Sequence, residues 1–404
     1  MNTLCLHNGM VMTGFAAMNR CAVLIEDGQI ADVFSEKRFE QKRFTPDTEV
    51  IDVNGAYIAP GFIDTHTHGA GGFGTEDGTE ESILNLSCFL ADQGVTAFNP
   101  TIYPSSPDVM LHQIRTISSA IGKEKGAQIM GIHLEGPFLS PDRLGVQHSE
   151  AVRPVNIQFM EQLWEASRGN PHSQDTSGRR IQDGHIVNMT VAPELKGMRE
   201  LALFCVKKGI VLQAGHTDAK YENMVEGMQA GILHATHLFN AMSALDHRNP
   251  HAVGAVLIHP EMSCEIIADG FHVHPDLFKL LLRDKPIDKI ILVTDCLKPA
   301  QQQGESFIAN GDELVFQDGV FRRKRDMVIA GSALTMIKGV QNLTRFGFSL
   351  EDAVKTASSN PAQVMHYANK GAIIPGKDAD ITVFDKDFNI KAVIIGGSIR
   401  KNTF

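Results

Sequence analysis

The chain has 404 residues, of which 43% are hydrophobic and 21% charged, and its formal net charge is −10. This balance is typical of a globular enzyme and excludes a largely disordered protein. The acidic charge argues against a nucleic-acid partner, and we interpret the one basic run, residues 322–325, as a solvated turn. Six cysteines are scattered without CxxC spacing, which argues against a disulfide framework or a thiolate metal site.

The first residues contain no basic stretch followed by an apolar core, so the sequence predicts no signal peptide. No run of about 18 apolar residues occurs, so it predicts no membrane span either. We therefore expect a cytoplasmic protein without a membrane partner.

Both ends of the chain have the pattern of short β-strands. Near the N-terminus these are residues 3–13, 21–26 and 29–34, with the hairpin signal Asp27-Gly28 between the last two. Near the C-terminus they are 379–385 and 390–395. We expect residues 1–56 and 366–404 to pair into one small β-sandwich module, although two unrelated flaps would give the same pattern.

Between these ends, residues 57–365 alternate short apolar runs with helical patterns. Strands are predicted at 58–66, 97–101, 129–135, 186–194, 210–216, 233–237, 264–269 and 289–295, and helices at 80–93, 156–166, 198–208, 221–230 and 275–283. Eight such units predict an α/β fold with a (β/α)8 TIM-like barrel. Residues 168–184, rich in Gly, Ser, Asp and Arg, are interpreted as an exposed insertion without a catalytic role.

Potential metal ligands stand at the ends of the predicted strands. His66 and His68 are two positions apart on one strand, so both rings point to the same side. Glu135, His216 and His237 end other strands and face the same opening, where TIM barrels carry their active sites. Imidazole and carboxylate together suit zinc or ferrous iron, and such an ion lowers the pKa of a bound water to about 7.

The last predicted strand ends at Asp295, which can take a proton from water and return it to a leaving group. Taken singly, a strand-end aspartate usually caps the following loop, and one His-x-His pair is a weak signal. Five potential ligands and one carboxylate at the same end of a barrel favour a metal-dependent hydrolase over separately satisfied core residues.

Several segments then match a known family, in order and at fitting spacings: PGFIDTHTHG, GIHLEGPF, AGHTDA, THLFNAM, IADGFHVH, LVTD and AGSALTM. They resemble the N-acetylglucosamine-6-phosphate deacetylases of the amidohydrolase superfamily. HLEGP is discriminating, because many relatives place a carboxylated lysine where these deacetylases use a glutamate.

The resemblance implies that Glu135, His216 and His237 hold the principal metal and that Asp295 is the general base and acid. Some members lack the first-strand histidine pair and work with one ion. This chain keeps the pair, so one or two divalent ions per subunit are expected, with zinc the first choice and iron the alternative.

The resemblance also implies the substrate contacts. Asn240 and Ala241 would contact the sugar, Arg248 and His272 would receive the phosphate, one of them reaching in from a dimer mate, and the backbone of Ile329, Ala330 and Gly331 would close over the sugar. Without the family, Arg248 is interpreted as a loop cation. Some members have a histidine where this chain has Gln147, with His148 one position later, so either Gln147 replaces that contact or the loop shifts.

The implied reaction is hydrolysis of N-acetyl-D-glucosamine 6-phosphate to D-glucosamine 6-phosphate and acetate, in amino-sugar catabolism, by a homodimer. Two alternatives remain open from the sequence. One is deacetylation of a related sugar phosphate such as N-acetyl-D-galactosamine 6-phosphate. The other is a catalytically dead amidohydrolase-like scaffold.

Overall fold

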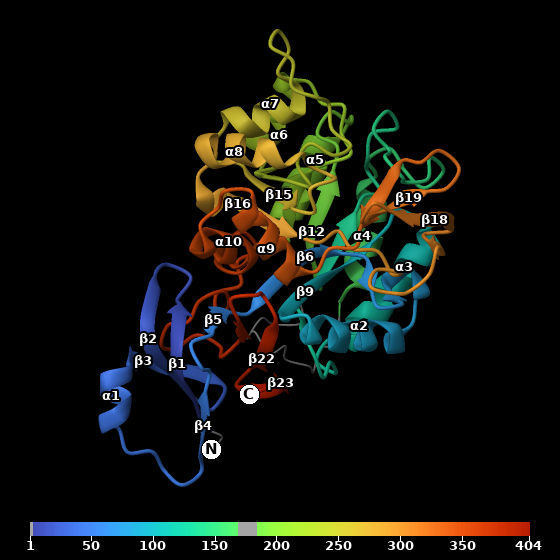
Figure 1. The fold of residues 1–404 in the computed structure, drawn as a ribbon. Helices are drawn as coiled ribbons and strands as arrows, with labels where there is room; N and C mark the ends of the chain where they lie inside the picture. Colours follow the sequence, from blue (N-terminus) through green and yellow to red (C-terminus); the bar gives the residue numbers. More distant parts are fainter. Residues whose placement is uncertain (1–2, 169–183) are drawn as a thin grey trace.

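The computed structural model describes residues 3–168 and 184–404. The insertion expected at 168–184 therefore lies almost wholly outside the described residues. Figure 1 shows a barrel of strands and helices, with a separate β module that contains both chain ends beside it.

The described strands of the barrel follow one another in chain order, and each neighbouring pair is parallel. They are β6 (Phe62–Thr67), β9 (Val95–Ile102), the interrupted strand β10 (Gln128–Ile129) and β11 (Ile132–Glu135), β12 (Ile186–Val191), β13 (Val211–Ala214), β14 (His234–Ala235), β15 (Ser263–Ile267) and β16 (Ile290–Val293). The prediction of a (β/α)8 barrel is confirmed.

Side chains as well as backbone join the last strand to the first. The Asp295 amide donates to the His66 carbonyl at 2.9 Å. The Thr294 amide and hydroxyl donate to the Asp64 carboxylate at 3.2 and 2.6 Å. Burial raises the pKa of Asp64 to about 7 although these donors oppose the shift. The closure brings the ends of β6 and β16 together.

The helices pack around the strands and bury a continuous apolar core that includes Phe98, Ile114, Leu201 and Leu292. Several begin at a side-chain cap, as at Thr79, which accepts from the Ser82 amide at 3.2 Å. The α-helices of the barrel are α2 (Glu80–Asp92), α3 (Pro107–Ala120), α4 (Ile157–Ala166), α5 (Met198–Lys207), α6 (Tyr221–Gln229), α7 (His251–Ile258), α8 (Pro275–Asp284), α9 (Met336–Arg345), α10 (Leu350–Ala357) and α11 (Ser359–Val364). Within the described ranges, none of the helices has both the length and the apolar character to cross a membrane.

The two chain ends form one mixed sheet in the order β23-β22-β21-β5-β1-β2-β3, with β4 paired to β1. Its strands are β1 (Thr3–Met12), β2 (Ala17–Glu26), β3 (Gln29–Ser35), β4 (Thr48–Asp52), β5 (Tyr57–Pro60), β21 (Ile381–Phe384), β22 (Ile390–Ile395) and β23 (Ser398–Asn402); the short helix α1 (Glu36–Gln41) follows β3. The expected pairing of both termini is confirmed, as a single hydrogen-bonded sheet.

The prediction of one strand over 58–66 was wrong, because the chain passes from the module to the barrel inside that range. β5 pairs with β1 and β21 of the module, whereas β6 pairs with β9 of the barrel. The break lies at Gly61, where an added Cβ would lie 2.1 Å from the Thr96 hydroxyl. Only glycine fits that close approach.

A four-stranded antiparallel sheet after β16 was not predicted: β17 (Ser306–Ala309), β18 (Asp312–Gln317), β19 (Val320–Arg323) and β20 (Ile329–Ser332). It contains the start of the basic run interpreted as a solvated turn. That interpretation was wrong for Arg323, whose side chain is 9% exposed and pairs with Asp326 at 2.6 Å.

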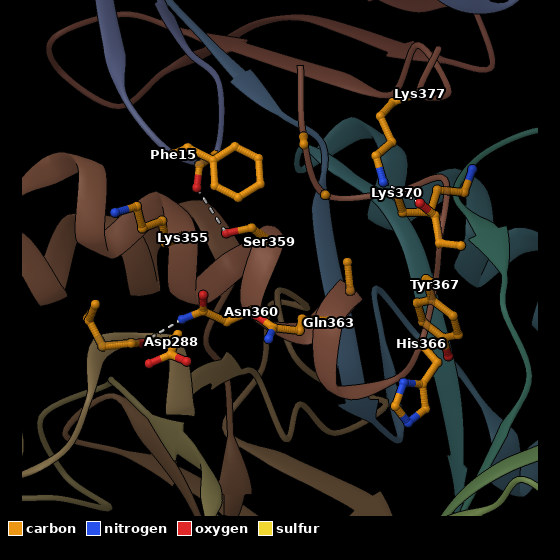
Figure 2. Close-up of a pocket in the computed structure, with 16 residues that line it drawn as sticks. Phe15, Asp288, Lys355, Ser359, Asn360, Gln363, His366, Tyr367, Lys370 and Lys377 are labelled. Carbon is orange, nitrogen blue, oxygen red and sulfur yellow. Dashed lines mark hydrogen bonds between the residues drawn. The ribbon is translucent and has the colours of Figure 1, made fainter. Parts of the chain in front are cut away.

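Lys370 links the β module to the barrel through two ion pairs and a hydrogen bond. Its ammonium lies 2.6 Å from Asp380 and 2.9 Å from Asp378, and it also donates to Gln128 of β10. Burial opposes the charge of Lys370, but the two carboxylates outweigh burial and raise its pKa. Figure 2 shows Lys370 on the wall of a cavity between the β1–β2 loop and helix α11.

Replacing this lysine should destabilise the fold. Lys370→Met leaves the buried carboxylate of Asp380 and the partly exposed one of Asp378 without their cation, so we expect the free energy of unfolding to fall by about 3–5 kcal/mol at pH 7. Because the folded pKa is raised, the contribution is complete at neutral pH and is lost only as the pH rises through that pKa. Urea unfolding measures the difference.

The matched control is Lys391→Met, which breaks a half-exposed pair with Asp385 and should cost less than about 1 kcal/mol. Equal losses in the two variants would contradict the role of Lys370.

Candidate metal centre

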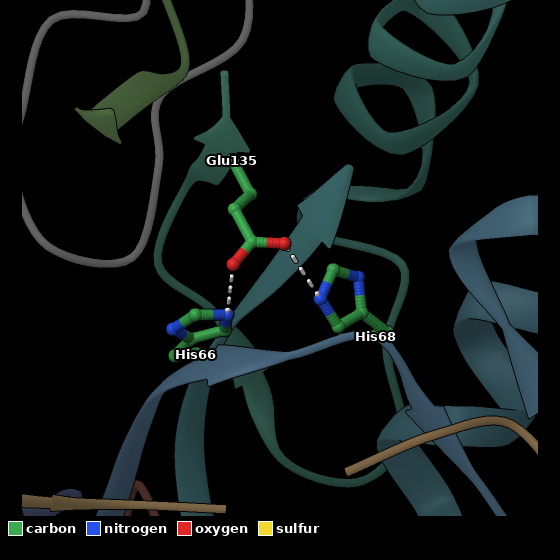
Figure 3. A group of neighbouring side chains, drawn as sticks. All are labelled: His66, His68 and Glu135. Carbon is green, nitrogen blue, oxygen red and sulfur yellow. Dashed lines mark ion pairs between the residues drawn. The ribbon is translucent and has the colours of Figure 1, made fainter. Parts of the chain in front are cut away.

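Two histidines of β6 face the carboxylate that ends β11. His66 Nε2 lies 3.5 Å from Glu135 Oε1, and His68 Nε2 lies 3.3 Å from Oε2 of the same residue. Figure 3 shows the two rings on one side of their strand, both directed at the carboxylate. The alternation of side chains along a strand places residues two apart in this way.

Two more histidines approach Glu135 from the loops after β13 and β14. The Nε2 atoms of His216 and His237 lie 3.1 and 3.2 Å from Glu135 Oε1, and 3.1 Å from each other. Both residues have a left-handed backbone, with φ of +46° and +27°. This conformation is rare outside glycine and turns each side chain inward as its strand ends.

The spacing of these atoms fits a metal ion. In a tetrahedral zinc site with Zn–N bonds of about 2.0–2.1 Å, ligand atoms lie about 3.3 Å apart, and the separations around Glu135 are 3.1–3.5 Å. Two donor sets share this residue, His66/His68/Glu135 and Glu135/His216/His237. His66 Nε2 is buried and has no hydrogen-bond partner within the described parts of the chain, as expected of a ligand atom.

Hydrogen bonds at the Nδ1 atoms, which face away from Glu135, orient the rings of His66, His68 and His216. His68 Nδ1 lies 3.2 Å from the Thr101 carbonyl, and His216 Nδ1 lies 3.1 Å from the Arg143 carbonyl. His66 Nδ1 lies 2.9 Å from a carboxylate oxygen of Glu265. Carbonyl and carboxylate oxygens only accept, so each Nδ1 donates and each Nε2 of the neutral ring offers its lone pair to the centre.

The charged groups around Glu135 shift one another's pKa values. Burial alone would raise the pKa of Glu135, but His216 and the neighbouring rings outweigh it and hold the pKa well below its usual range. Burial opposes protonation of His66, yet the carboxylates of Asp295 and Glu265 outweigh burial and raise its pKa to about 10. The pKa of His216 is also raised, because Glu135 outweighs burial.

Asp295 lies where the sequence placed it, beside the first-strand histidines. Its Oδ1 is 3.4 Å from His66 Nε2 and 3.6 Å from His68 Nε2. It has a left-handed backbone with φ of +47°, and it lines the cavity above the centre. Its side chain is 13% exposed, so it can reach both the metal ligands and a bound molecule.

Most of the residues predicted to bind substrate line the same cavity: Gln147, Asn240, Ala241, His272, Ile329 and Ala330. Gln147 donates to Glu135 Oε2 at 2.6 Å, whereas His148 points away and lies 2.8 Å from the Asn310 carbonyl. The structure therefore places Gln147, not His148, beside the metal ligands.

Two predicted residues are not among those that line the cavity. Arg248 is exposed on the loop between Ala244 and Asn249. Gly331 is buried in β20, next to the cavity residue Ala330.

Tyr103 and Glu265 contact histidines of the site and were not predicted. Tyr103 lines the cavity and stacks on His68, with ring centroids 3.6 Å apart and planes 5° apart. Glu265 is fully buried in β15 and holds His66. The sequence signal for Glu265 was a carboxylate inside an otherwise apolar strand. The only signal for Tyr103 was its position just after a strand.

Comparisons with known proteins agree on one group. The amidohydrolase family matches residues 57–400. The N-acetylglucosamine-6-phosphate deacetylase of Bacillus subtilis is 31% identical over 97% of this chain and 94% of its own. The N-acetylgalactosamine-6-phosphate deacetylase of a Shewanella species is 30% identical over 96% of this chain and 94% of its own. The crystal structure of N-acetylglucosamine-6-phosphate deacetylase from Pasteurella multocida has a TM-score of 0.89 at 26% identity, and the match covers 99% of this chain and all of the other.

Metal uptake should release protons. Because its pKa is raised to about 10, the ring of His66 holds a proton at neutral pH in the absence of metal, and a metal ion binds only the neutral ring. The raised pKa of His216 acts in the same direction. Affinity should therefore increase as the pH is raised from 6 to 9. Calorimetric titration of the metal-free protein with Zn²⁺ or Co²⁺, in buffers of different ionisation enthalpy, counts the protons. A pH-independent affinity without proton release would contradict this charge arrangement.

Proposed function

The chain belongs to the N-acetylglucosamine-6-phosphate deacetylases of the amidohydrolase family, and we propose that it hydrolyses N-acetyl-D-glucosamine 6-phosphate to D-glucosamine 6-phosphate and acetate. The observation that carries the proposal is the cluster of four histidines and one glutamate at the strand ends, with Asp295 beside it. A scaffold that had lost catalysis would have no need to keep these buried polar groups facing one another.

Glu135, His216 and His237 would hold the principal divalent ion, and His66 and His68 would complete a second position with Glu135. When bound, a divalent ion supplies Lewis acidity, which polarises a carbonyl and makes water a stronger acid. Zinc suits this donor set best, with ferrous iron as the alternative.

Asp295 would move the proton. Its carboxylate accepts a proton from the attacking water as the new C–O bond forms at the acetamide carbonyl. It then donates that proton to the nitrogen as the C–N bond breaks, which releases acetate and the free amine. The position of Asp295 over the cavity, next to the ligands of β6, supports this role.

Removing the proton carrier should abolish most turnover. Asp295→Asn keeps the shape of the side chain but cannot carry the proton, so kcat should fall by about 10²–10⁴. The metal content, measured by elemental analysis, should stay unchanged. Wild-type turnover in this variant would contradict the assignment of Asp295 as the proton carrier.

The walls of the cavity would bind the sugar. Asn240 and Ala241 lie on the loop after His237, and Ile329 and Ala330 lie on the opposite strand β20, with Gly331 behind them. Gln147 is close enough to the ligand Glu135 to orient a group bound at the centre.

The phosphate would be bound by His272, with Arg248 as a second cation supplied by its exposed loop, in the same subunit or a dimer mate. His272 Nδ1 lies 2.6 Å from Asp269 Oδ2, so the aspartate orients the ring, and Nε2 donates to the phosphate when the ring carries both protons. An imidazole and a guanidinium together suit a phosphate dianion.

Loss of His272 should weaken binding of the phosphate group alone. We expect His272→Ala to raise KM for the sugar phosphate about 10- to 100-fold, since a hydrogen bond to a charged group contributes about 1.5–3 kcal/mol. Its activity on unphosphorylated N-acetylglucosamine should not change. The control is His274→Ala, a 73% exposed histidine two positions away. An equal loss with both substrates would contradict phosphate recognition by His272.

A second candidate substrate is N-acetyl-D-galactosamine 6-phosphate, because the Shewanella relative named for it is nearly as similar to this chain as the Bacillus enzyme. The two sugars differ in one hydroxyl configuration, and the same ligands and Asp295 would serve both. The ratio of kcat/KM for the two sugar phosphates decides between them, and we propose that the gluco epimer is preferred. Zinc as the native metal, the homodimer and the cytoplasmic location stay predictions.

A further inference from the structure

A chain of polar side chains runs through the interior of the barrel. TIM-barrel interiors are usually filled with branched aliphatic side chains, yet Asn99, Asn188, Gln213 and Glu265 are all fully buried here. They come from β9, β12, β13 and β15. Placing four such groups out of water is favourable only if they satisfy one another.

Each amide in this chain donates to the next member. Asn99 Nδ2 donates to Asn188 Oδ1 at 3.1 Å, and Asn188 Nδ2 donates to Gln213 Oε1 at 3.2 Å. Gln213 Nε2 donates to Glu265 Oε1 at 3.1 Å. At the far end, the Tyr367 hydroxyl donates to Asn99 Oδ1 at 2.8 Å, from the wall of the cavity in Figure 2. All donors therefore point toward the Glu265 carboxylate.

The other oxygen of Glu265 determines the state of His66. Glu265 Oε2 lies 2.9 Å from His66 Nδ1, and it also accepts from the His237 amide at 3.3 Å. Because a carboxylate only accepts, the hydrogen of the neutral ring stays on Nδ1. Nε2 is then the free ligand atom, 3.5 Å from Glu135 and 3.4 Å from Asp295.

We propose that Glu265, held by Gln213, Asn188 and Asn99, is the positioning residue that makes His66 a metal ligand and so completes the His66/His68/Glu135 half of the centre. Glu265 is not among the residues that line the cavity, so it acts through His66 and not on the substrate. The inference rests on the proposed function only for the presence of a divalent ion.

Calorimetric titration of the metal-free, full-length protein with Co²⁺ tests this role without any measurement of turnover. Glu265→Gln keeps the volume but removes the charge, and its amide can donate to Nδ1 and stabilise the wrong tautomer. We expect the affinity for Co²⁺ at the position that includes His66 to fall about 10- to 100-fold. Losses of this size are typical when the hydrogen-bond partner of a metal-bound histidine is removed. The control is Glu194→Gln, which changes a carboxylate that accepts from the Thr217 hydroxyl and the Asp218 amide and is not among the residues lining the cavity; this variant should bind Co²⁺ like wild type.

A double-mutant cycle separates positioning from general damage to the barrel. In the His66→Ala background, Glu265→Gln should make no further difference to Co²⁺ affinity. Equal losses with and without His66, or wild-type affinity in Glu265→Gln, would overturn the proposal.

If Glu265→Gln does not fold, Gln213→Met removes only one donor to Glu265. This variant should weaken Co²⁺ binding several-fold when His66 is present and should have no effect when His66 is absent. A protein that passes these tests but does not deacetylate the sugar phosphate would refute the proposed function and leave this inference intact.

Discussion

The buried carboxylate of Glu135 is the group around which the site is arranged. A charge at this depth must be compensated largely by protein groups, because the Glu135 side chain is only 2% exposed. Four imidazole nitrogens provide the compensation at 3.1–3.5 Å, and the same carboxylate belongs to both donor sets. The strands β6, β11, β13 and β14 must therefore end at one level. A shift in the register of any of these strands would move its histidine or Glu135 out of the site.

That constraint also explains the strained backbone at the strand ends. His216, His237 and Asp295 all have positive φ, which costs about 1–2 kcal/mol for each non-glycine residue. Such conformations persist where the surrounding structure determines them. Here the closure between Asp295 and His66 and the contact of Glu265 with the His237 amide hold Asp295 and His237 against the strain, and the Arg143 carbonyl holds the ring of His216. The strained backbone lowers the stability of the barrel, but it directs these side chains inward.

The sequence predicted well that the four histidines, Glu135 and Asp295 come together, because buried parallel strands end visibly where polar residues begin, and the active side of a barrel follows from strand direction. Glu265 was missed because its partner His66 is 199 positions away, and only the folded barrel brings them together. The β17–β20 sheet was missed because its first two strands are largely exposed and because a basic run typical of a turn starts within β19. Arg323 showed no sign of burial, since its carboxylate partners are recognised only in the folded sheet.

Gln147 and Arg248 show the same limit at the level of single residues. The sequence left two arrangements of the loop after Glu135 open, and only the fold placed Gln147 beside the carboxylate and His148 on the Asn310 carbonyl. Arg248 lies on an exposed loop outside the cavity lining, so whether this loop of the same subunit or that of a dimer mate would bring it to the phosphate stays a prediction.

We propose that the cluster around Glu135 performs a metal-dependent deacetylation of a sugar phosphate. The most direct test is acetate release from N-acetyl-D-glucosamine 6-phosphate by protein stripped of metal, measured as Zn²⁺ is added back in substoichiometric steps. The account predicts no turnover without metal and a rise that saturates at one or two ions per chain. Full turnover by the stripped protein, or none at any Zn²⁺ or Fe²⁺ level with either epimer of the sugar phosphate, would contradict it.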